Sequence, residues 1–150
     1  MTELKPGDSA PDILAPSQDG RNFSLKELQG KKNVVLYFYP KDDTPGCTKE
    51  ACGFRDLHDN IARLEAEIVG VSLDGVESHR KFSRKFQLPF TLVSDEDKKI
   101  AKSYGVLGLG GFTARRVTFI IDKQGIIRHV FPKVDASAHP SEVLALLEKM

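Results

Sequence analysis

The sequence feature that most constrains the fold is an uninterrupted apolar and aromatic run from Val34 to Tyr39. A strand with apolar side chains at successive positions is buried on both faces, as in parallel or mixed sheets that helices cover on both sides. The run is followed by a polar loop with Pro and Gly, residues 40–46, and then by apolar residues at helical spacing. This order predicts an α/β protein built around a central, fully buried strand.

The elements that follow alternate between helix and strand. Apolar residues in steps of three and four predict one amphipathic helix, and they are Ala51, Phe54, Leu57, Ile61 and Leu64. The further expected strands are residues 68–73, 91–93, 117–121 and 126–131; the further expected helices are residues 76–86, 95–104 and one that begins near Pro140. Residues 122–125 join the last two strands as an antiparallel hairpin.

The N-terminal segment predicts two smaller features. The turn signal Asp19-Gly20 lies between short apolar pieces and predicts a β-hairpin. Ser24 and Glu27 have capping-box spacing and predict a short helix that ends at Gly30. The whole order favours a thioredoxin-like α/β sandwich, in which helices flank a mixed central sheet, as a single domain over residues 1–150. The strand order does not follow from the sequence.

Composition excludes several classes of function. The 150 residues carry 22 basic and 21 acidic side chains, so the basic excess of a nucleic-acid binder is missing. No apolar run approaches the roughly 18–20 residues of a membrane helix. The N-terminus resembles neither a signal peptide nor a transit peptide, which predicts a cytoplasmic protein. Two cysteines are too few for a secreted disulfide scaffold, so we interpret them as chemical groups.

Cys47 stands where the buried strand passes into the long helix. With Thr44 as the helix cap and Pro45 at the first helical position, Cys47 lies in the first turn. Unpaired N–H groups and the positive end of the helix dipole favour a thiolate there. Ligands of open α/β folds also bind at the carboxyl ends of the strands, where this loop must lie. Cys47 is therefore the candidate nucleophile.

Cys52 stands five residues after Cys47 on the same predicted helix. An ideal helix separates two such Cα atoms by about 7.5 Å along its axis and by roughly 140° around it. A disulfide needs Cα atoms about 4.4–6.8 Å apart, so an intact helix cannot hold one. Either the two cysteines never bond or the first turns unwind, which Gly53 makes less costly.

The segment around Cys47 resembles a known family. Its residues Pro40-x₃-Thr44-x₂-Cys47 match the active-site motif of the peroxiredoxins, and the wider pattern is similar to their bacterioferritin-comigratory-protein, or PrxQ, subfamily. That wider pattern comprises Tyr37–Pro40, Thr44–Thr48, Glu50–Cys52, Pro6–Asp8, Ala10-Pro11, Ser94-Asp95 and Arg116–Asp122. The likeness covers nearly the whole chain.

This resemblance implies a role for each of six residues. Cys47 would attack the peroxide and become a sulfenic acid, and Cys52 would resolve it as a disulfide. Thr44 would orient the peroxide, and Pro40 would shield the sulfur. Arg116 would stabilise the thiolate and the departing oxygen, and Glu50 would orient that guanidinium. We prefer Arg116 to its neighbour Arg115 because Arg116 stands two residues before Thr118, with which it should share a face of its strand.

The resemblance also implies the reaction partners. The substrates would be hydrogen peroxide and alkyl hydroperoxides, and thioredoxin or a similar dithiol would reduce the Cys47–Cys52 disulfide. No cofactor or metal is expected because the thiolate itself is the reductant. Since both cysteines belong to one chain, the protein is expected to be a monomer. The Gly-rich stretch 106–112, with Leu109 exposed, is expected to form an apolar rim of the pocket, and Asp42 and Asp43 are expected to point to solvent.

Other functions fit the residues less well. A dithiol oxidoreductase needs Cys-x-x-Cys, whereas Cys47 and Cys52 have four residues between them. A phosphate-binding loop needs a lysine that the Gly-rich stretch 106–112 lacks. A zinc site from Cys47, Cys52, His58 and His79 has no standard spacing, and its histidines are expected on solvated helix positions. A cysteine hydrolase would need a histidine base beside the cysteine, and the sequence places none of its four histidines there. The alternative that remains is a non-enzymatic redox sensor or interaction domain with a switchable Cys47–Cys52 disulfide.

Overall fold

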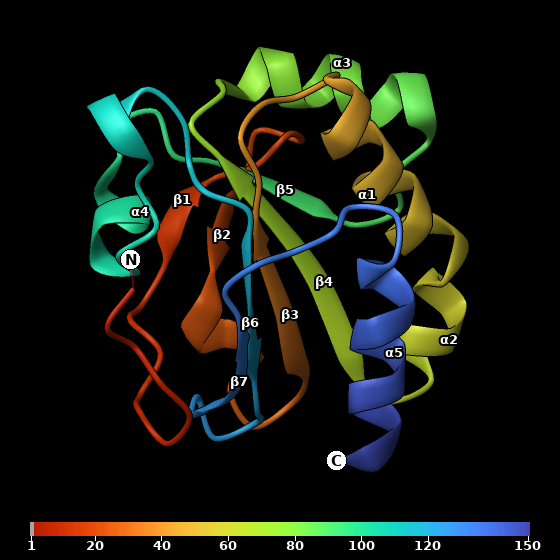
Figure 1. The fold of residues 1–150 in the computed structure, drawn as a ribbon. Coiled ribbons are helices and arrows are strands. Elements are labelled where there is room, and N and C mark those ends of the chain that lie inside the picture. The colour runs from red at the N-terminus through yellow and green to blue at the C-terminus, as the bar shows by residue number, and fades with distance from the viewer. Residues whose placement is uncertain (1) are drawn as a thin grey trace.

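The computed structural model describes residues 2–150, and a five-stranded mixed sheet forms its centre (Figure 1). The strands are β3 (Asn33–Phe38), β4 (Ala66–Ser72), β5 (Thr91–Ser94), β6 (Val117–Ile121) and β7 (Ile127–Phe131). Their order in the sheet is β5-β4-β3-β6-β7. β3, β4 and β5 are parallel, whereas β6 is antiparallel to both β3 and β7. The strand predicted from the apolar run is therefore central and paired on both sides.

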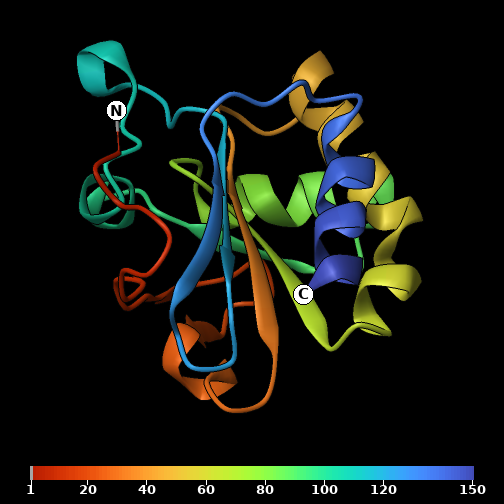
Figure 2. The same cartoon turned by 60° about the horizontal axis from the view of Figure 1, so that its bottom comes forward.

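Helices cover both faces of this sheet, as the fold class requires (Figures 1 and 2). One face is covered by α1 (Pro45–Asp56), α2 (His58–Ala62), α3 (Val76–Phe86) and α5 (His139–Lys149). The other face is covered by α4 (Lys99–Ser103) and by the N-terminal hairpin of β1 (Leu14–Pro16) and β2 (Asn22–Ser24). The predicted thioredoxin-like sandwich with an N-terminal hairpin is confirmed.

The side chains of β3 alternate between the two layers. Leu36 and Phe38 pack in the core on the α4 side, whereas Val35 and Tyr37 pack in the core under α1 and α5. Alternation by single residues is the geometry of a strand, and burial of both sets explains why the run is apolar throughout. Cys47 belongs to the second core.

The predicted capping box at Ser24 is wrong. Residues Leu25–Leu28 form a single 3₁₀ turn, and the Ser24 side chain makes no capping hydrogen bond. A 3₁₀ turn this short gains little from a capping box. Gly30 does follow the turn with φ +83°, a left-handed conformation that favours glycine.

The long amphipathic helix predicted from Ala51 to Leu64 is in fact two helices. α1 ends at Asp56 and α2 begins at His58, because Leu57 leaves helical geometry with φ −100° and ψ 6°. Ile61 is nevertheless fully buried beneath α2. Apolar periodicity indicates which side of the chain is buried. Because α1 and α2 bury the same side, the spacing of apolar residues continues across the break and does not reveal it.

The helix predicted over residues 95–104 is shorter than expected. α4 covers Lys99–Ser103, because Lys98 adopts the left-handed region with φ 66° and so cannot extend the helix backwards. Asp95 still caps it: its carboxylate accepts hydrogen bonds from the amides of Ile100 (3.0 Å) and Ala101 (2.8 Å). Among residues 2–150, no helix combines the length and the apolar composition that crossing a bilayer requires.

Candidate active site

Cys47 lies in the first turn of α1, directly beyond the carboxyl end of β3. Thr44 occupies the N-cap position and Pro45 the first helical position, as predicted. The Thr44 hydroxyl does not cap the helix; it donates a hydrogen bond to the carbonyl oxygen of Lys41 (3.0 Å). Cys47 is a free cysteine with only 2% of its surface exposed. The sulfur therefore lies at the end of the helix where unpaired backbone N–H groups and the positive end of the helix dipole are found.

The Arg116 side chain joins Cys47 to Glu50. Its Nη2 atom lies 3.4 Å from the Cys47 Sγ, and its Nη1 atom donates to the Glu50 Oε1 at 2.7 Å. Glu50 lies one helical turn beyond Cys47 and is fully buried. The guanidinium is thus held by the carboxylate with one nitrogen against the sulfur, which is the contact that the resemblance led us to expect.

Strand alternation explains why Arg116 rather than Arg115 reaches the sulfur. Arg116 precedes β6, in which Thr118 and Ile120 face the layer of α1 and α5. By the two-residue period, Arg116 faces the same layer. The Arg115 amide instead donates to the Val106 carbonyl oxygen at 2.7 Å.

Burial dominates the electrostatics of this site. Burial raises the pKa of Glu50 to about 7, although the nearby Arg116 acts in the opposite direction. Burial alone would lower the pKa of Arg116, but the negative charges of Cys47 and Glu50 raise it overall. Glu50 Oε2 is buried without a hydrogen-bond partner among the described residues. The carboxyl group is therefore subject to two opposing effects: its buried site favours the neutral form, and Arg116 favours the anion.

Tyr37 is a neighbour of the site to which the sequence assigned no role. It projects from β3 into the core that contains Cys47, and its hydroxyl is buried without a partner in residues 2–150. Burial raises its pKa, and the negative charges of Glu50 and Cys47 raise it further. Strand periodicity could have found it, because Tyr37 shares its face with Val35 and precedes the active-site loop.

His139 was also missed, because its neighbours come from distant segments. Its Nε2 atom lies 2.8 Å from the Thr118 Oγ1, and its ring packs edge-on against Phe54 and Phe131. Burial lowers the pKa of His139 to about 4, with a smaller contribution from the positive charge of Arg116. This histidine is therefore neutral at physiological pH, and Arg116 is the cation of the site.

The expectation that Asp42 points to solvent is wrong. Its carboxylate accepts hydrogen bonds from the hydroxyls of Tyr39 (2.6 Å) and Ser78 (2.8 Å) and lies 2.7 Å from His79 Nδ1. His79 Nε2 lies 2.9 Å from the Val93 carbonyl oxygen, which can only accept a hydrogen bond. Asp43, in contrast, is exposed and pairs with Lys85 (2.9 Å). Asp42 therefore fastens the loop before α1 to α3 and β5.

The zinc set weighed from the sequence is not assembled. His79 is fully buried, so its expected solvated position is wrong, and it contacts Asp42 and not the two cysteines. Within residues 2–150, the one cluster of metal-binding side chains is Asp42, Asp74 and His79. Asp74 Oδ2 accepts from the Asp42 amide (2.9 Å) and the Ser72 hydroxyl (2.6 Å). These hydrogen bonds account for the cluster without an ion.

Cys52 is half-buried on the uninterrupted α1, and it too is a free cysteine. The structure thus holds both thiols on an intact helix, whose geometry does not permit a disulfide. Gly53 has a packing role that the sequence did not indicate. A Cβ atom there would lie 2.7 Å from Pro140 Cγ, so glycine lets α1 approach α5 closely.

The Gly-rich stretch 106–112 lies away from Cys47. Leu109 is 92% exposed, as expected, and Phe112 is 82% exposed. Figures 1 and 2 show this stretch above α4, on the other side of the sheet from α1. The prediction that this stretch forms an apolar rim around the Cys47 pocket is therefore wrong. Pro40, directly after Tyr39, is half-buried in the loop that leads to α1.

A buried thiol beneath a guanidinium, at the N-terminus of a helix on a thioredoxin-like sheet, defines a thiol-based redox enzyme. The comparisons with known proteins agree. Residues 6–130 match the model of the AhpC/TSA family. The chain is 45% identical over 150 residues to "Putative peroxiredoxin bcp" of Coxiella burnetii, covering 96% of this chain and 99% of that protein.

Two further relatives point the same way. A chloroplastic peroxiredoxin Q of Sedum lineare is 43% identical over 152 residues, covering 100% of this chain and 81% of that protein. A solved structure of the Xanthomonas campestris bacterioferritin comigratory protein, which is described as having alkyl peroxide reduction activity, superposes with TM-score 0.88 at 32% identity. It covers 99% of this chain and 98% of that one. The chain belongs to the AhpC/TSA family, among the peroxiredoxins of the bacterioferritin-comigratory-protein and PrxQ type.

Membership in this family establishes the class of reaction. The protein is a thiol peroxidase, an oxidoreductase that reduces peroxides at the expense of a thioredoxin-like dithiol. A non-enzymatic redox sensor, the alternative left open by the sequence, is not favoured by these relatives.

Proposed function

We propose that Cys47 is the residue that reacts with peroxide. The 3.4 Å contact between Cys47 Sγ and Arg116 Nη2 carries this proposal. The thiolate attacks one peroxide oxygen, the O–O bond breaks, and a sulfenic acid forms on Cys47. The departing hydroxide or alkoxide takes up one proton, which balances the proton that the Cys47 thiol lost, and leaves as water or an alcohol. Arg116 stabilises the thiolate before the attack and the departing oxygen as its negative charge develops.

Three further residues support this step in our proposal. The Thr44 hydroxyl, bonded to the Lys41 carbonyl oxygen before peroxide binds, rotates to orient the peroxide oxygens. Pro40 limits the access of water and of a second peroxide to the sulfur. Glu50 is a positioning residue, because its 2.7 Å hydrogen bond fixes the plane of the guanidinium against Cys47.

Cys52 is the resolving thiol in the second step. Its sulfur attacks the Cys47 sulfenic acid, an S–S bond forms and water leaves. The step needs the first turns of α1 to open, since the intact helix keeps the thiols apart. A dithiol reductant then restores both thiols by two exchange reactions and becomes a disulfide itself. Thioredoxin is the simplest such partner.

Hydrogen peroxide and alkyl hydroperoxides are the proposed substrates, and the alkyl peroxide reduction activity of the Xanthomonas campestris protein supports the second class. We further propose that one monomer, a single domain of residues 1–150, performs the whole cycle, because both reacting cysteines belong to one helix. The proposed compartment is the cytoplasm, which the bacterial relative supports. A plastid location, as for the Sedum relative, is the alternative that cell fractionation would distinguish.

The test is a thiol titration by intact mass. The reduced protein receives one equivalent of hydrogen peroxide and is quenched within seconds with an alkylating agent. We expect both thiols to become resistant to alkylation, with a loss of about two daltons and no dimer, as an intramolecular disulfide requires.

Two variants assign the steps. Cys52→Ser should retain a sulfenic acid on Cys47, which a dimedone adduct detects, and Cys47→Ser should not react. If both thiols of the wild-type protein remain alkylatable after minutes, the proposed roles are wrong. If Cys47 alone reacts, its resolving partner is not Cys52.

A further inference from the structure

Of the two free cysteines, Cys52 is the more exposed. Cys47 is 2% exposed, whereas Cys52 is only half-buried. Thiol–disulfide exchange needs the attacking thiolate to approach one sulfur directly, so access decides which sulfur is attacked. A folded dithiol protein must therefore sit on the face of the molecule to which Cys52 opens.

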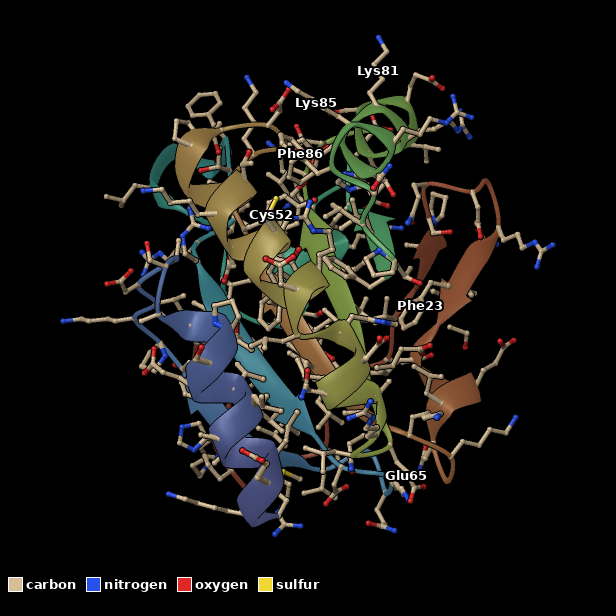
Figure 3. The ribbon with its side chains drawn as sticks, turned by 90° about the vertical axis from the view of Figure 1, so that its right-hand side faces the viewer. Phe23, Cys52, Glu65, Lys81, Lys85 and Phe86 are labelled. Carbon is tan, nitrogen blue, oxygen red and sulfur yellow. The ribbon has the colours of Figure 1, made fainter. Side chains whose placement is uncertain are left out.

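Cys52 opens toward the C-terminal end of α3. It shares a side of α1 with Arg55, three residues later, and Arg55 Nη1 donates to the Phe86 carbonyl oxygen at 2.9 Å. Figure 3 shows Cys52 on the outer face of α1 beside Phe86, with Lys85 and Lys81 beyond it along α3. The face between α1 and α3 thus has a sulfur and an aromatic ring at its centre.

The half of α1 that carries Cys52 is anchored to its surroundings by three neighbouring residues. Phe54 is fully buried, Gly53 fits closely against Pro140, and Arg55 is bonded to the end of α3. When the first turn opens to form the disulfide, we expect Cys47 to move toward Cys52. Cys52 then stays on the α1–α3 face in the oxidised protein.

This face carries more cations than carboxylates. The cations on the exposed sides of α1 and α3 are Lys49, Arg55, Arg80, Lys81, Arg84 and Lys85, and the carboxylates there or paired with them are Asp43, Asp56 and Glu77. Each of these carboxylates already pairs with one cation. Within residues 2–150, Lys49, Lys81 and Arg84 have no carboxylate at ion-pair distance.

The rest of the surface does not share this excess. The α1–α3 face carries three more cations than carboxylates, whereas the net charge of the whole chain is only +1, so the remaining residues together carry no excess of cations. Lys85 Nζ lies 5.3 Å from the centre of the Phe86 ring, which places positive charge directly around the apolar centre. An apolar centre with a charged rim is the usual organisation of a small protein interface, and its charges steer the encounter with the partner.

Given the proposed function, on which this inference rests, we infer that the α1–α3 face is the docking surface for the dithiol reductant. The partner is a small protein that presents its reactive cysteine within an apolar patch and carries acidic side chains around it. The Cys52 and Phe86 surface meets the apolar patch, and Lys49, Lys81 and Arg84 meet the acidic side chains. The reductant thiolate attacks Cys52 Sγ, and Cys47 leaves as a thiolate.

The test uses a double charge reversal, Lys81→Glu with Arg84→Glu, and a bacterial thioredoxin as the probe. Neither residue contacts the Cys47 site. At low salt we expect kcat/KM for thioredoxin to fall about tenfold, through KM, with the difference shrinking as ionic strength rises. Oxidation of Cys47 by hydrogen peroxide in a single turnover should not change. Reduction of the disulfide by dithiothreitol, which is small and uncharged, should not change either.

The matched control is Lys31→Glu with Lys32→Glu; these residues directly precede β3 and so lie at the opposite end of this strand from Cys47. This variant changes the net charge equally and should leave the thioredoxin kinetics as in the wild-type protein. Circular dichroism and thermal melting confirm that both variants fold.

Two results would overturn the inference. One is wild-type thioredoxin kinetics in the Lys81/Arg84 variant, and the other is the same loss in both variants, which would report net charge alone. Failure of the proposed function looks different, since the wild-type protein would then form no intramolecular disulfide with hydrogen peroxide. If the disulfide forms and dithiothreitol reverses it, the peroxidase cycle stands whatever the charge variants show.

Discussion

Two buried polar clusters adjoin the segment that passes from β3 into α1, and they differ in how completely they are hydrogen-bonded. Around Asp42, both carboxylate oxygens and both nitrogens of His79 have close partners. Around Cys47, a buried sulfur faces a guanidinium, while Glu50 Oε2 and the Tyr37 hydroxyl have no partner among the described residues. The first cluster is saturated and the second is not.

This difference indicates a structural role for the Asp42 cluster and a chemical role for the Cys47 cluster. Buried polar groups with all their hydrogen bonds made stabilise one arrangement of the chain, and the Asp42 cluster fastens the loop to α3 in this way. Unsatisfied groups raise the free energy of the folded state, and proteins retain them mainly at functional sites. A cluster that holds the loop and a cluster that reacts should therefore respond differently to mutation.

The largest expected effect is on the rate, from Arg116→Gln. Removing the positive charge beside Cys47 should lower the rate constant for oxidation by hydrogen peroxide by about 10²–10³-fold, as loss of a preorganised charge-stabilising donor does. Stopped-flow fluorescence or competition with a second peroxidase measures this rate. Arg115→Gln is the control and should retain nearly the wild-type rate. Equal losses of rate in both variants would show that Arg116 does not have the proposed role.

The next largest effect is on stability, from Asp42→Ala. It leaves Tyr39, Ser78 and His79 without their common acceptor and should lower the free energy of unfolding by about 3 kcal/mol. Ser78→Ala, which removes one hydrogen bond, should cost about 1 kcal/mol. Urea unfolding measures both values. The peroxide rate of folded Asp42→Ala should change less than tenfold, and a larger change at unaltered stability would contradict the division between the clusters.

A smaller effect concerns the buried His139, whose pKa is lowered by burial to about 4. Between pH 6.5 and 4 the unfolded chain binds a proton that the folded protein does not, so stability should fall as the pH falls through this range. We expect a loss of about 2 kcal/mol between pH 7 and pH 4.5 that His139→Gln lacks and His58→Gln retains. Parallel stability curves for the wild-type protein and His139→Gln would refute this.

The smallest effect is the pH dependence contributed by Glu50, whose pKa burial raises to about 7. As the pH falls through 7, protonation weakens the hold on Arg116 and should slow peroxide reduction. Glu50→Gln should be about tenfold slower at pH 8 and should lose this inflection. The exposed control, Glu148→Gln, should keep the wild-type profile.

Stability should show the opposite dependence on pH. Because the pKa of the Glu50 carboxyl group is higher in the folded than in the unfolded state, the folded state favours the neutral form. Its contribution to the free energy of unfolding is therefore fully present below about pH 4.5 and is lost as the pH rises through 7. Glu50→Gln should therefore become more stable relative to the wild-type protein across this range. A constant difference between the two unfolding curves would show that Glu50 does not titrate there.

The sequence by itself determined what local rules govern. Alternation and helical spacing predicted the strands and helices, the turn signals predicted the hairpins, and the strand–loop–helix order predicted Cys47 in the first turn of α1. The two-residue period of β6 also predicted that Arg116 shares the face of Thr118. These features depend on neighbours within a few residues, so the pattern of the chain carries them.

Only the tertiary structure decided which distant groups meet. Arg116 reaches Cys47 because β6 pairs antiparallel beside β3, and Asp42 meets His79 because α3 packs over the loop before α1. The neutral His139 and the raised pKa of Glu50 arise from burial, which is a property of the assembled layers. Loop residues have no periodicity that reports their partners, and for this reason Asp42 could be placed in solvent from the sequence and in the core by the fold.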